Sequence, residues 1–146
     1  PFDLEIKGLE GGTVLDHPEI SVRALANTHL SANPAYSELP ELYPHMALES
    51  YSFSCKIADK TVVYSGDITA LTELDPLTPS ADIIIVEVAH FDPEDLEPAL
   101  AATSAEKIIL THVHPGLEQR TAAAARSWGD ERVAIATDGM RVPLDA

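Results

Sequence analysis

The chain has 146 residues and a formal net charge of −15, with 24 acidic residues against nine Lys and Arg. This length is typical of one domain and is enough to bury roughly 70% of the unfolded surface. The shortage of Lys and Arg argues against a broad nucleic-acid-binding face. No apolar run approaches the roughly 20 residues of a membrane span. Neither a nucleic acid nor a membrane is therefore expected as a partner.

The N-terminal part of the chain predicts strands that lead into loops. Residues 2–7 alternate apolar and charged side chains, which indicates an edge strand, and glycines within residues 8–12 interrupt it. Turn-forming residues follow at 16–18, where His17 is expected on the surface. The β-prone residues 20–28 then predict a strand that runs directly into His29.

A long loop and a hairpin come next. Residues 31–49 contain three prolines and no clean period, which indicates a structured loop that forms a substrate wall. Residues 50–57 alternate as a strand does, and a short turn at 58–60 leads into a second strand at 61–64. That strand passes through a Ser-Gly turn and ends on the carboxylate of Asp67.

The second half of the chain alternates between strands and helices. Strands are expected at residues 82–88, 107–111, 132–137 and 140–144, and helices at residues 68–74, 93–102 and 117–128. Asp92 is expected to be the N-cap of the second of these helices. Pro98 is expected to kink its helix or to delay its start. Asp138 and Gly139 are expected to form the hairpin turn before the last strand. The predicted fold class is therefore α/β, a mixed sheet with helices mainly on one face.

Three of the predicted strands lead to side chains of types that can bind metals: His29, Asp67 and His112. Ligands collect outside the carboxyl ends of strands in open α/β sheets, and imidazole with carboxylate suits Zn²⁺, Mn²⁺ or Fe²⁺. In an extended backbone His114 would share a face with His112, but Pro115 indicates that the strand has already ended. We therefore predict His29, Asp67 and His112 as metal ligands, with His114 as a neighbour.

Two further histidines compete for roles in this site. His45 is an alternative to His29, but it lies inside the proline-rich loop, whereas His29 directly ends a strand. His90 follows another strand end, where it could stabilise a transition state or donate a proton; the alternative is a loop histidine that caps the next helix. We predict His90 as a catalytic residue. Glu87, just before it, could accept a hydrogen bond from a metal-bound imidazole.

The order of these motifs resembles the C-terminal half of a metallo-β-lactamase-fold hydrolase, of the ribonuclease Z-like or general metal-dependent kind. The resemblance extends over about residues 20–144 and rests on Asn27-Thr28-His29, Ser50-Tyr51-Ser52-Phe53, Val63-Tyr64-Ser65-Gly66-Asp67 and Ile109-Leu110-Thr111-His112. It implies that His29 is the third histidine motif, that Asp67 bridges two metals and that His112 is the last histidine. It also implies that the chain is one αβ half of an αββα sandwich.

The family's His-x-His-x-Asp-His signature, which supplies most ligands of the first metal and one of the second, has no counterpart in this sequence. Residues 1–146 are therefore interpreted as a single domain, the C-terminal half of a larger hydrolase whose N-terminal half is absent. The resemblance implies two Zn²⁺ ions per complete site, with Mn²⁺ or Fe²⁺ as alternatives. The site is incomplete in this chain, so the isolated chain is expected to be inactive.

Two functions of different classes stay open. The first is a metal-dependent hydrolase whose parent protein attacks a small ester, thioester, lactone or phosphodiester with a metal-activated water. The acidic charge favours a small-molecule substrate and weakens the ribonuclease Z branch. The second is a non-catalytic scaffold or oligomerisation module with a degenerate form of the fold.

The partners and the location follow from the same observations. Because the absent half would leave one face of the sheet in water, we expect a homodimer through that face. The one cysteine, Cys55, excludes an internal disulfide and favours a reducing, cytoplasmic location.

Overall fold

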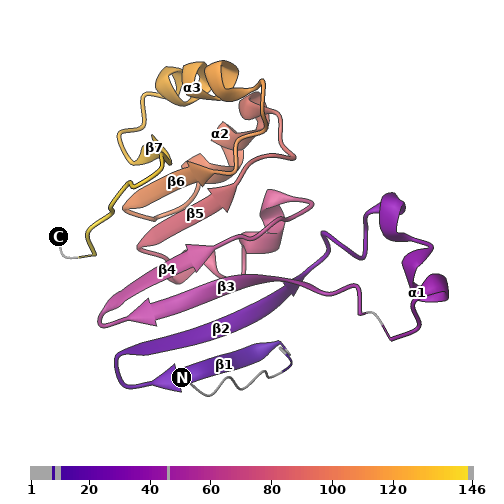
Figure 1. Ribbon diagram of the computed structural model, residues 1–146. Helices are drawn as coiled ribbons and strands as arrows, with labels where there is room; N and C mark the ends of the chain where they lie inside the picture. The colour runs from indigo at the N-terminus through magenta and orange to yellow at the C-terminus, as the bar shows by residue number, and fades with distance from the viewer. Residues whose placement is uncertain (1–7, 9–10, 46, 145–146) are drawn as a thin grey trace.

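The structure is a computed structural model that describes residues 8, 11–45 and 47–144, and these form a mixed sheet with helices packed mainly on one face (Figure 1). The strands lie in chain order across the sheet: β1 Gly12–His17, β2 Ile20–Asn27, β3 Ser50–Ile57, β4 Lys60–Tyr64, β5 Ile83–Glu87, β6 Lys107–Thr111 and β7 Val133–Ile135. Neighbouring strands from β1 to β4 are antiparallel, and those from β4 to β7 are parallel. The predicted α/β class is confirmed.

The helical segments of the described chain are α2 Pro93–Ala101 and α3 Glu118–Ser127, with short turns at η1 Pro34–Tyr36, α1 Leu39–Leu42, η2 Leu71–Leu74 and η3 Thr78–Ser80. The core lies between the sheet and these helices. It contains alternate residues of the central strands and the apolar side of α2: Val63, Ile84, Val86, Leu96, Leu100, Ile108 and Leu110. Each such side chain contributes about 1.5–3 kcal/mol on burial. None of the described helices is long and apolar enough to cross a membrane.

The two ends of the predicted sheet differ from the structure. The sequence does not predict β1, because this strand is largely exposed and its side chains show no alternation of buried and exposed positions. The edge strand predicted at residues 2–7 lies outside the described residues. The strand predicted at residues 140–144 is wrong: the backbone turns where Met140 N–H donates to the Thr137 carbonyl at 2.9 Å, and Pro143 lacks an N–H for a further ladder. Asp138 and Gly139 therefore form a turn but no hairpin.

Two of the predicted helices differ in detail from those in the structure. Residues 68–74 contain only η2, a single 3₁₀ turn, rather than a helix over the whole segment. The helix α2 begins at Pro93 and carries Pro98 inside it, so the proline does not delay its start. The side chain of Asp92, at the N-cap position of α2, makes no capping hydrogen bond and instead lies 3.1 Å from Nη1 of Arg120.

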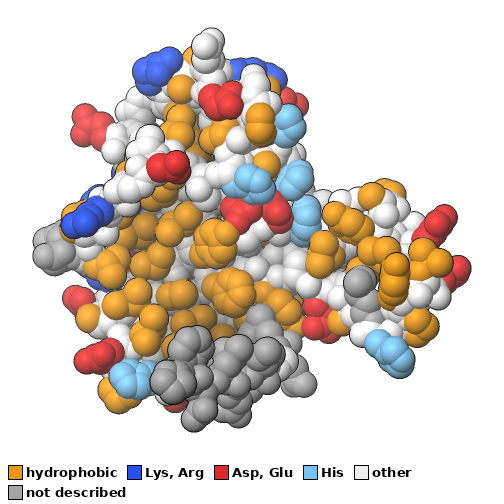
Figure 2. All heavy atoms as spheres, in the orientation of Figure 1, with side chains coloured by type: hydrophobic (Ala, Val, Ile, Leu, Met, Phe, Trp, Pro, Cys, Tyr) orange, Lys and Arg blue, Asp and Glu red, His pale blue; other side chains and the backbone are white. Residues whose placement is uncertain are grey.

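The face of the sheet opposite the helices is apolar, and we call it the open face. Because side chains alternate along a strand, the neighbours of the core residues point to this face, and they include Val62, Ile83, Ile85 and Ile109. These residues line a cavity of about 280 Å³ together with part of the segment 136–144. In Figure 2, hydrophobic side chains form an extended patch across this side of the sheet.

The sheet topology brings four strand ends to one edge. β2 is antiparallel to β3, which is antiparallel to β4, so β2 runs in the same direction as the parallel strands β4, β5 and β6. The carboxyl ends of all four therefore meet. The segments that follow them carry His29, Asp67, His90 and His112.

Candidate metal centre

Asp67 lies at the middle of this edge and is positioned by the turn that follows β4. Gly66 has a φ of +56°, and a Cβ atom there would lie 2.7 Å from the carbonyl oxygen of Tyr51. Only glycine fits both conditions without strain. Buried Ser65 ties the turn to the neighbouring strand through a 2.9 Å hydrogen bond from its N–H to the Ile85 carbonyl. The backbone thus presents the Asp67 carboxylate at a fixed place.

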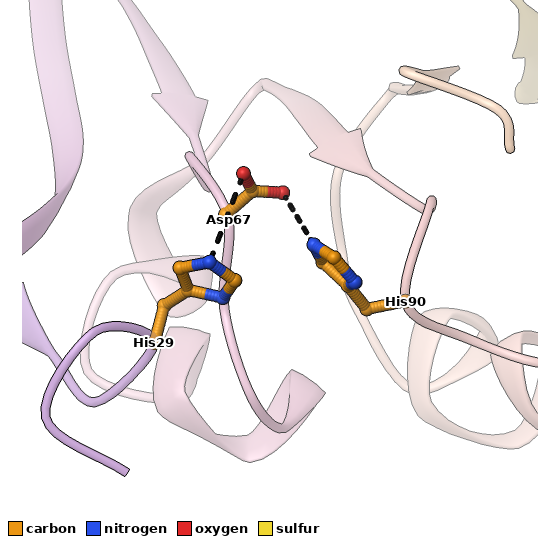
Figure 3. A group of neighbouring side chains, drawn as sticks. All are labelled: His29, Asp67 and His90. Atoms are coloured by element: carbon orange, nitrogen blue, oxygen red, sulfur yellow. Dashed lines mark ion pairs between the residues drawn. The ribbon is translucent and has the colours of Figure 1, made fainter. Parts of the chain in front are cut away.

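Three imidazoles surround the Asp67 carboxylate. Oδ1 lies 3.3 Å from Nε2 of His90 and 3.6 Å from Nδ1 of His112, and Oδ2 lies 4.0 Å from Nε2 of His29. Figure 3 shows His29 and His90 beside each other, each pointing toward the carboxylate. Oδ1 is buried, and among the described residues it accepts no hydrogen bond. A buried carboxylate oxygen without a donor is costly, which is the situation that a bound cation relieves.

His29 is held by a network below the loop that carries it. Its backbone N–H donates to Oδ1 of Asn27 at 3.2 Å, and the buried Asn27 side chain also contacts the hydroxyls of Ser50 and Ser52. The preceding residue, Thr28, donates its N–H to the Glu73 carboxylate at 2.7 Å. These contacts leave the His29 side chain 16% exposed, with its Nε2 toward Asp67.

His112 is oriented by the carboxylate of Glu87. Nδ1 of His112 lies 2.8 Å from Oε2 of Glu87, and the Tyr64 hydroxyl donates to Oε1. The hydrogen bond to Glu87 raises the pKa of His112, while burial and Glu87 together raise the pKa of Tyr64 to about 12. Burial would raise the pKa of Glu87, but the hydrogen bonds from Tyr64 and His112 outweigh burial and lower it. Glu87 is therefore an anion that fixes Nδ1 of His112 and leaves Nε2 as the nitrogen available to a metal.

The backbone at His112 is also unusual. Its φ is +51°, in the left-handed region that few residues other than glycine adopt. Such strain persists where the surrounding structure requires it, and it is concentrated at functional sites. In this chain it directs the imidazole toward Glu87 and Asp67 as β6 ends.

The structure brings together all four residues that the sequence singles out. His29, Asp67 and His90 form one group whose ligand atoms all lie within 4.8 Å of one another, and Asp67, Glu87 and His112 form a second. Asp67 belongs to both groups. Two carboxylates and three imidazoles are a donor set that suits Zn²⁺, Mn²⁺ or Fe²⁺.

The two histidines with alternative roles do not join these groups. His114 is exposed, and its Nδ1 lies 2.7 Å from the carbonyl oxygen of Pro115. His45 is exposed within the long loop and belongs to neither cluster of metal-binding side chains found in the described residues. His114 and His45 therefore lie outside both groups, and the choice of His29 and His112 as ligands stays a prediction.

Two site residues escape the sequence reasoning. Tyr64 is predicted only as a strand residue, although its hydroxyl contacts Glu87. The signal lies in the register of the parallel strands, where Tyr64 pairs with Ile85, two residues before Glu87 on the same face. The other residue is Glu73, whose carboxylate accepts the N–H groups of Thr28, Thr69 and Ala70 and so joins the loops of His29 and Asp67.

Comparison with known proteins gives matches among solved structures. Neither protein-family models nor curated protein sequences match the chain. The crystal structure of a protein from Parabacteroides distasonis ATCC 8503 named "Putative metal-dependent hydrolase" matches 90% of this chain with a TM-score of 0.63 and 16% identity. An isothiocyanate hydrolase from Delia radicum gut bacteria matches 94% of this chain with a TM-score of 0.67 and 18% identity.

These matches concern the fold. The chain spans 57% and 58% of the length of the two matched structures, somewhat less than three fifths. At such low identity the likeness shows a shared architecture and carries no residue assignments. The chain therefore has a fold found in hydrolases, in agreement with the mixed sheet and its one layer of helices.

Proposed function

We propose that this protein is the ligand-bearing part of a metal-dependent hydrolase in which His29, Asp67 and His112 hold divalent ions. The proposal depends above all on one observation: the buried Oδ1 of Asp67 accepts no hydrogen bond among the described residues, although imidazoles from neighbouring strand ends lie around it. When bound, a divalent ion supplies an activated water near neutral pH and polarises the bond to be cleaved. Zn²⁺ is the proposed ion, because imidazole nitrogens dominate the donor set.

The residues of the chain have separate tasks in this proposal. Asp67 lies between His29 and His112 and would be the ligand within reach of ions on either side. Glu87 holds Nδ1 of His112, which fixes the imidazole plane and makes Nε2 a better ligand. The negative charge of Asp67 and Glu87 at one edge attracts the cation before it binds. The predicted catalytic role of His90, to stabilise a transition state or to donate a proton, stays a prediction.

The proposed substrate is a small molecule with a hydrolysable bond. A cavity of about 260 Å³ adjoins the site and is lined by His29, Asn33, Pro34, Thr69 and His90 among others. A volume of this order accommodates a small ester, thioester, lactone or phosphodiester but not a folded macromolecule. The net charge of −15 disfavours a polyanionic substrate. One matched protein is named as an isothiocyanate hydrolase, so an isothiocyanate joins the candidates.

The resemblance to metallo-β-lactamase-fold hydrolases supports the same assignment. That family has a third histidine motif, a bridging aspartate and a last histidine in this order, and His29, Asp67 and His112 follow β2, β4 and β6 in the same order here. The fold shared with two proteins named as hydrolases is compatible with this proposal.

The test is a hydrolysis assay on the natural full-length chain loaded with Zn²⁺ or Mn²⁺. A panel of one chromogenic ester, thioester, lactone, phosphodiester and isothiocyanate covers the candidate bonds. We expect turnover of at least one substrate, its loss after a chelator, and a fall in kcat/KM of about 100-fold or more in Asp67→Asn and His112→Ala. His114→Ala is the matched control, because the His114 side chain is exposed and its ring contacts the carbonyl oxygen of Pro115 rather than a predicted ligand.

Either of two results would contradict the proposal. If Asp67→Asn retains full activity, the hydrolysis does not depend on this site. If no substrate is turned over by a protein that binds metal, the alternative of a non-catalytic scaffold is favoured instead.

A further inference from the structure

We propose that His90 is a metal ligand and that His29, Asp67 and His90 together form a divalent-cation site within this chain. The inference deepens the proposed function and rests on it for the roles of His29 and Asp67. Its test measures metal binding alone, so that either proposal can fail without the other.

The three side chains converge on one point. Nε2 of His90 lies 3.3 Å from Oδ1 of Asp67, and Nε2 of His29 lies 4.0 Å from Oδ2, so each imidazole faces its own carboxylate oxygen (Figure 3). All three ligand atoms lie within 4.8 Å of one another. An ion with bonds of about 2.0–2.1 Å holds its ligand atoms roughly 3–4 Å apart. A closure of less than about 1 Å therefore completes the site.

The two rings are arranged for a shared ion rather than for stacking. Their centroids are 5.0 Å apart and their planes are inclined by 35°. His29 is held in place from below by Asn27 and by the contact of Thr28 with Glu73. His90 follows β5 in a turn in which Phe91 N–H donates to the Val88 carbonyl at 3.2 Å.

The second group, Asp67, Glu87 and His112, is less suited to hold an ion by itself. Both oxygens of Glu87 already accept hydrogen bonds, one from the Tyr64 hydroxyl and one from Nδ1 of His112. An ion bound there would displace one of these contacts. In the group of His29, Asp67 and His90, the only carboxylate is Asp67, whose Oδ1 accepts no hydrogen bond in the described part of the chain. Of the two groups found in the described residues, the triad with His90 is therefore the one in which a bound ion would displace neither hydrogen bond of Glu87.

The chemistry of the triad indicates its ligand. Two imidazole nitrogens and one carboxylate oxygen select Zn²⁺, Co²⁺ or Fe²⁺ over Mg²⁺ and Ca²⁺, which prefer oxygen donors. Three protein ligands leave at least one coordination position for water or substrate. His90, with its side chain 51% exposed, lies at the mouth of the adjoining cavity. If Nε2 of His90 binds the ion, that nitrogen is no longer available for proton transfer, so the ligand role excludes the predicted role as a proton donor through the same atom.

The experiment is a Co²⁺ titration of the purified, chelator-treated chain, followed by the visible absorption of the ion and then by displacement with Zn²⁺. We expect a saturable Co²⁺ spectrum from the wild-type chain and an affinity lower by about 100-fold or more in His90→Ala, because even the loss of a hydrogen-bond partner of a ligand costs about 10–100-fold. His90→Gln, which keeps a polar side chain of similar size, should lose affinity to a similar extent. His114→Ala is the control and should bind as the wild type does.

X-ray absorption on the Zn²⁺-loaded chain supplies a count of imidazoles that does not depend on a variant folding well. The expected count is at least two per ion in the wild type and one fewer in His90→Ala. An unchanged affinity and an unchanged imidazole count in His90→Ala would overturn the inference, as would a wild-type chain that binds no Co²⁺. A chain that binds metal through His90 but hydrolyses nothing would contradict the proposed function alone.

Discussion

At the scale of single residues, the site depends on a glycine that no other residue can replace. Gly66 has a φ of +56°, and an added Cβ would approach the Tyr51 carbonyl oxygen to 2.7 Å. We expect Gly66→Ala to lower the free energy of unfolding by more than the roughly 1–2 kcal/mol that left-handed backbone costs an L-residue, because the backbone must also move. Gly129→Ala is the matched control, with a φ of +64° and no atom within 4 Å of its Cβ. Urea denaturation measures both, and equal losses would mean that the contact with Tyr51 has no effect.

A second residue-scale prediction concerns the orientation of His112. Glu87 raises the pKa of His112 above its ordinary value of 6.5, because the carboxylate accepts a hydrogen bond from the protonated imidazole. In Glu87→Gln the neutral amide stabilises the imidazolium less, so the pKa of His112 should fall toward that value. NMR titration of the histidine ring signals in the chelator-treated chain measures the change. The control is Glu94→Gln, which alters an exposed carboxylate paired with Arg120 and should leave His112 unchanged.

At the scale of elements, one carboxylate joins two loops that carry predicted ligands. Glu73 in η2 accepts N–H groups from Thr28 at 2.7 Å, Thr69 at 2.8 Å and Ala70 at 3.0 Å. Burial would raise the pKa of Glu73, but these backbone hydrogen bonds outweigh burial and lower it below 4.5. Because the folded-state pKa is the lower one, Glu73 stabilises the chain fully above its unfolded pKa, and this stabilisation is lost as pH falls through the folded value.

Replacement of this carboxylate should weaken the junction of the two loops. In Glu73→Gln the amide NH₂ cannot accept, so at least one backbone N–H loses its partner, at a cost of about 1–2 kcal/mol. The difference in stability between wild type and variant should be present at pH 7 and should shrink as pH falls below 4.5. Chemical denaturation at several pH values measures this difference. Glu97→Gln, on the exposed side of α2, is the control, and a difference that persists undiminished at low pH would contradict the assignment.

At the scale of elements, the sequence predicts some features of the structure and misses others. Strands β2 to β6 have β-prone or alternating side chains, and this local signal is sufficient to place His29, Asp67, His90 and His112 at strand ends. β1 lacks the signal because it is an exposed edge strand that buries almost nothing. The contact of Tyr64 with Glu87 depends on the pairing of β4 with β5, and a register between distant strands is not written in either strand alone. Local structure could therefore be predicted, whereas contacts made across the sheet could not.

At the scale of the whole molecule, the sheet has one covered and one open face. Val63, Ile84 and Ile108 are fully buried beneath the helices, whereas Val62 and Ile85 on the open face are only partly buried. Figure 2 shows the hydrophobic patch on the open face. Contiguous apolar surface larger than a few hundred Å² is rare on monomers. Acidic and histidine side chains gather at the edge of this patch, so an occupant of the open face would also lie beside the candidate metal centre.

We propose that a second copy of the chain covers the open face when the 146 residues are isolated. Burial of apolar area drives this association at about 25 cal/mol per Å², while the charge of −15 on each copy opposes it. The dimer should therefore tighten as salt rises and screens the repulsion. Val62→Glu places a charge on the open face and should shift the chain to monomer, whereas Ala123→Glu on the exposed side of α3 adds the same charge elsewhere and should not. Sedimentation velocity at micromolar concentration and two salt levels decides the question, and a wild-type monomer in both buffers would mean that the open face does not bind a second copy.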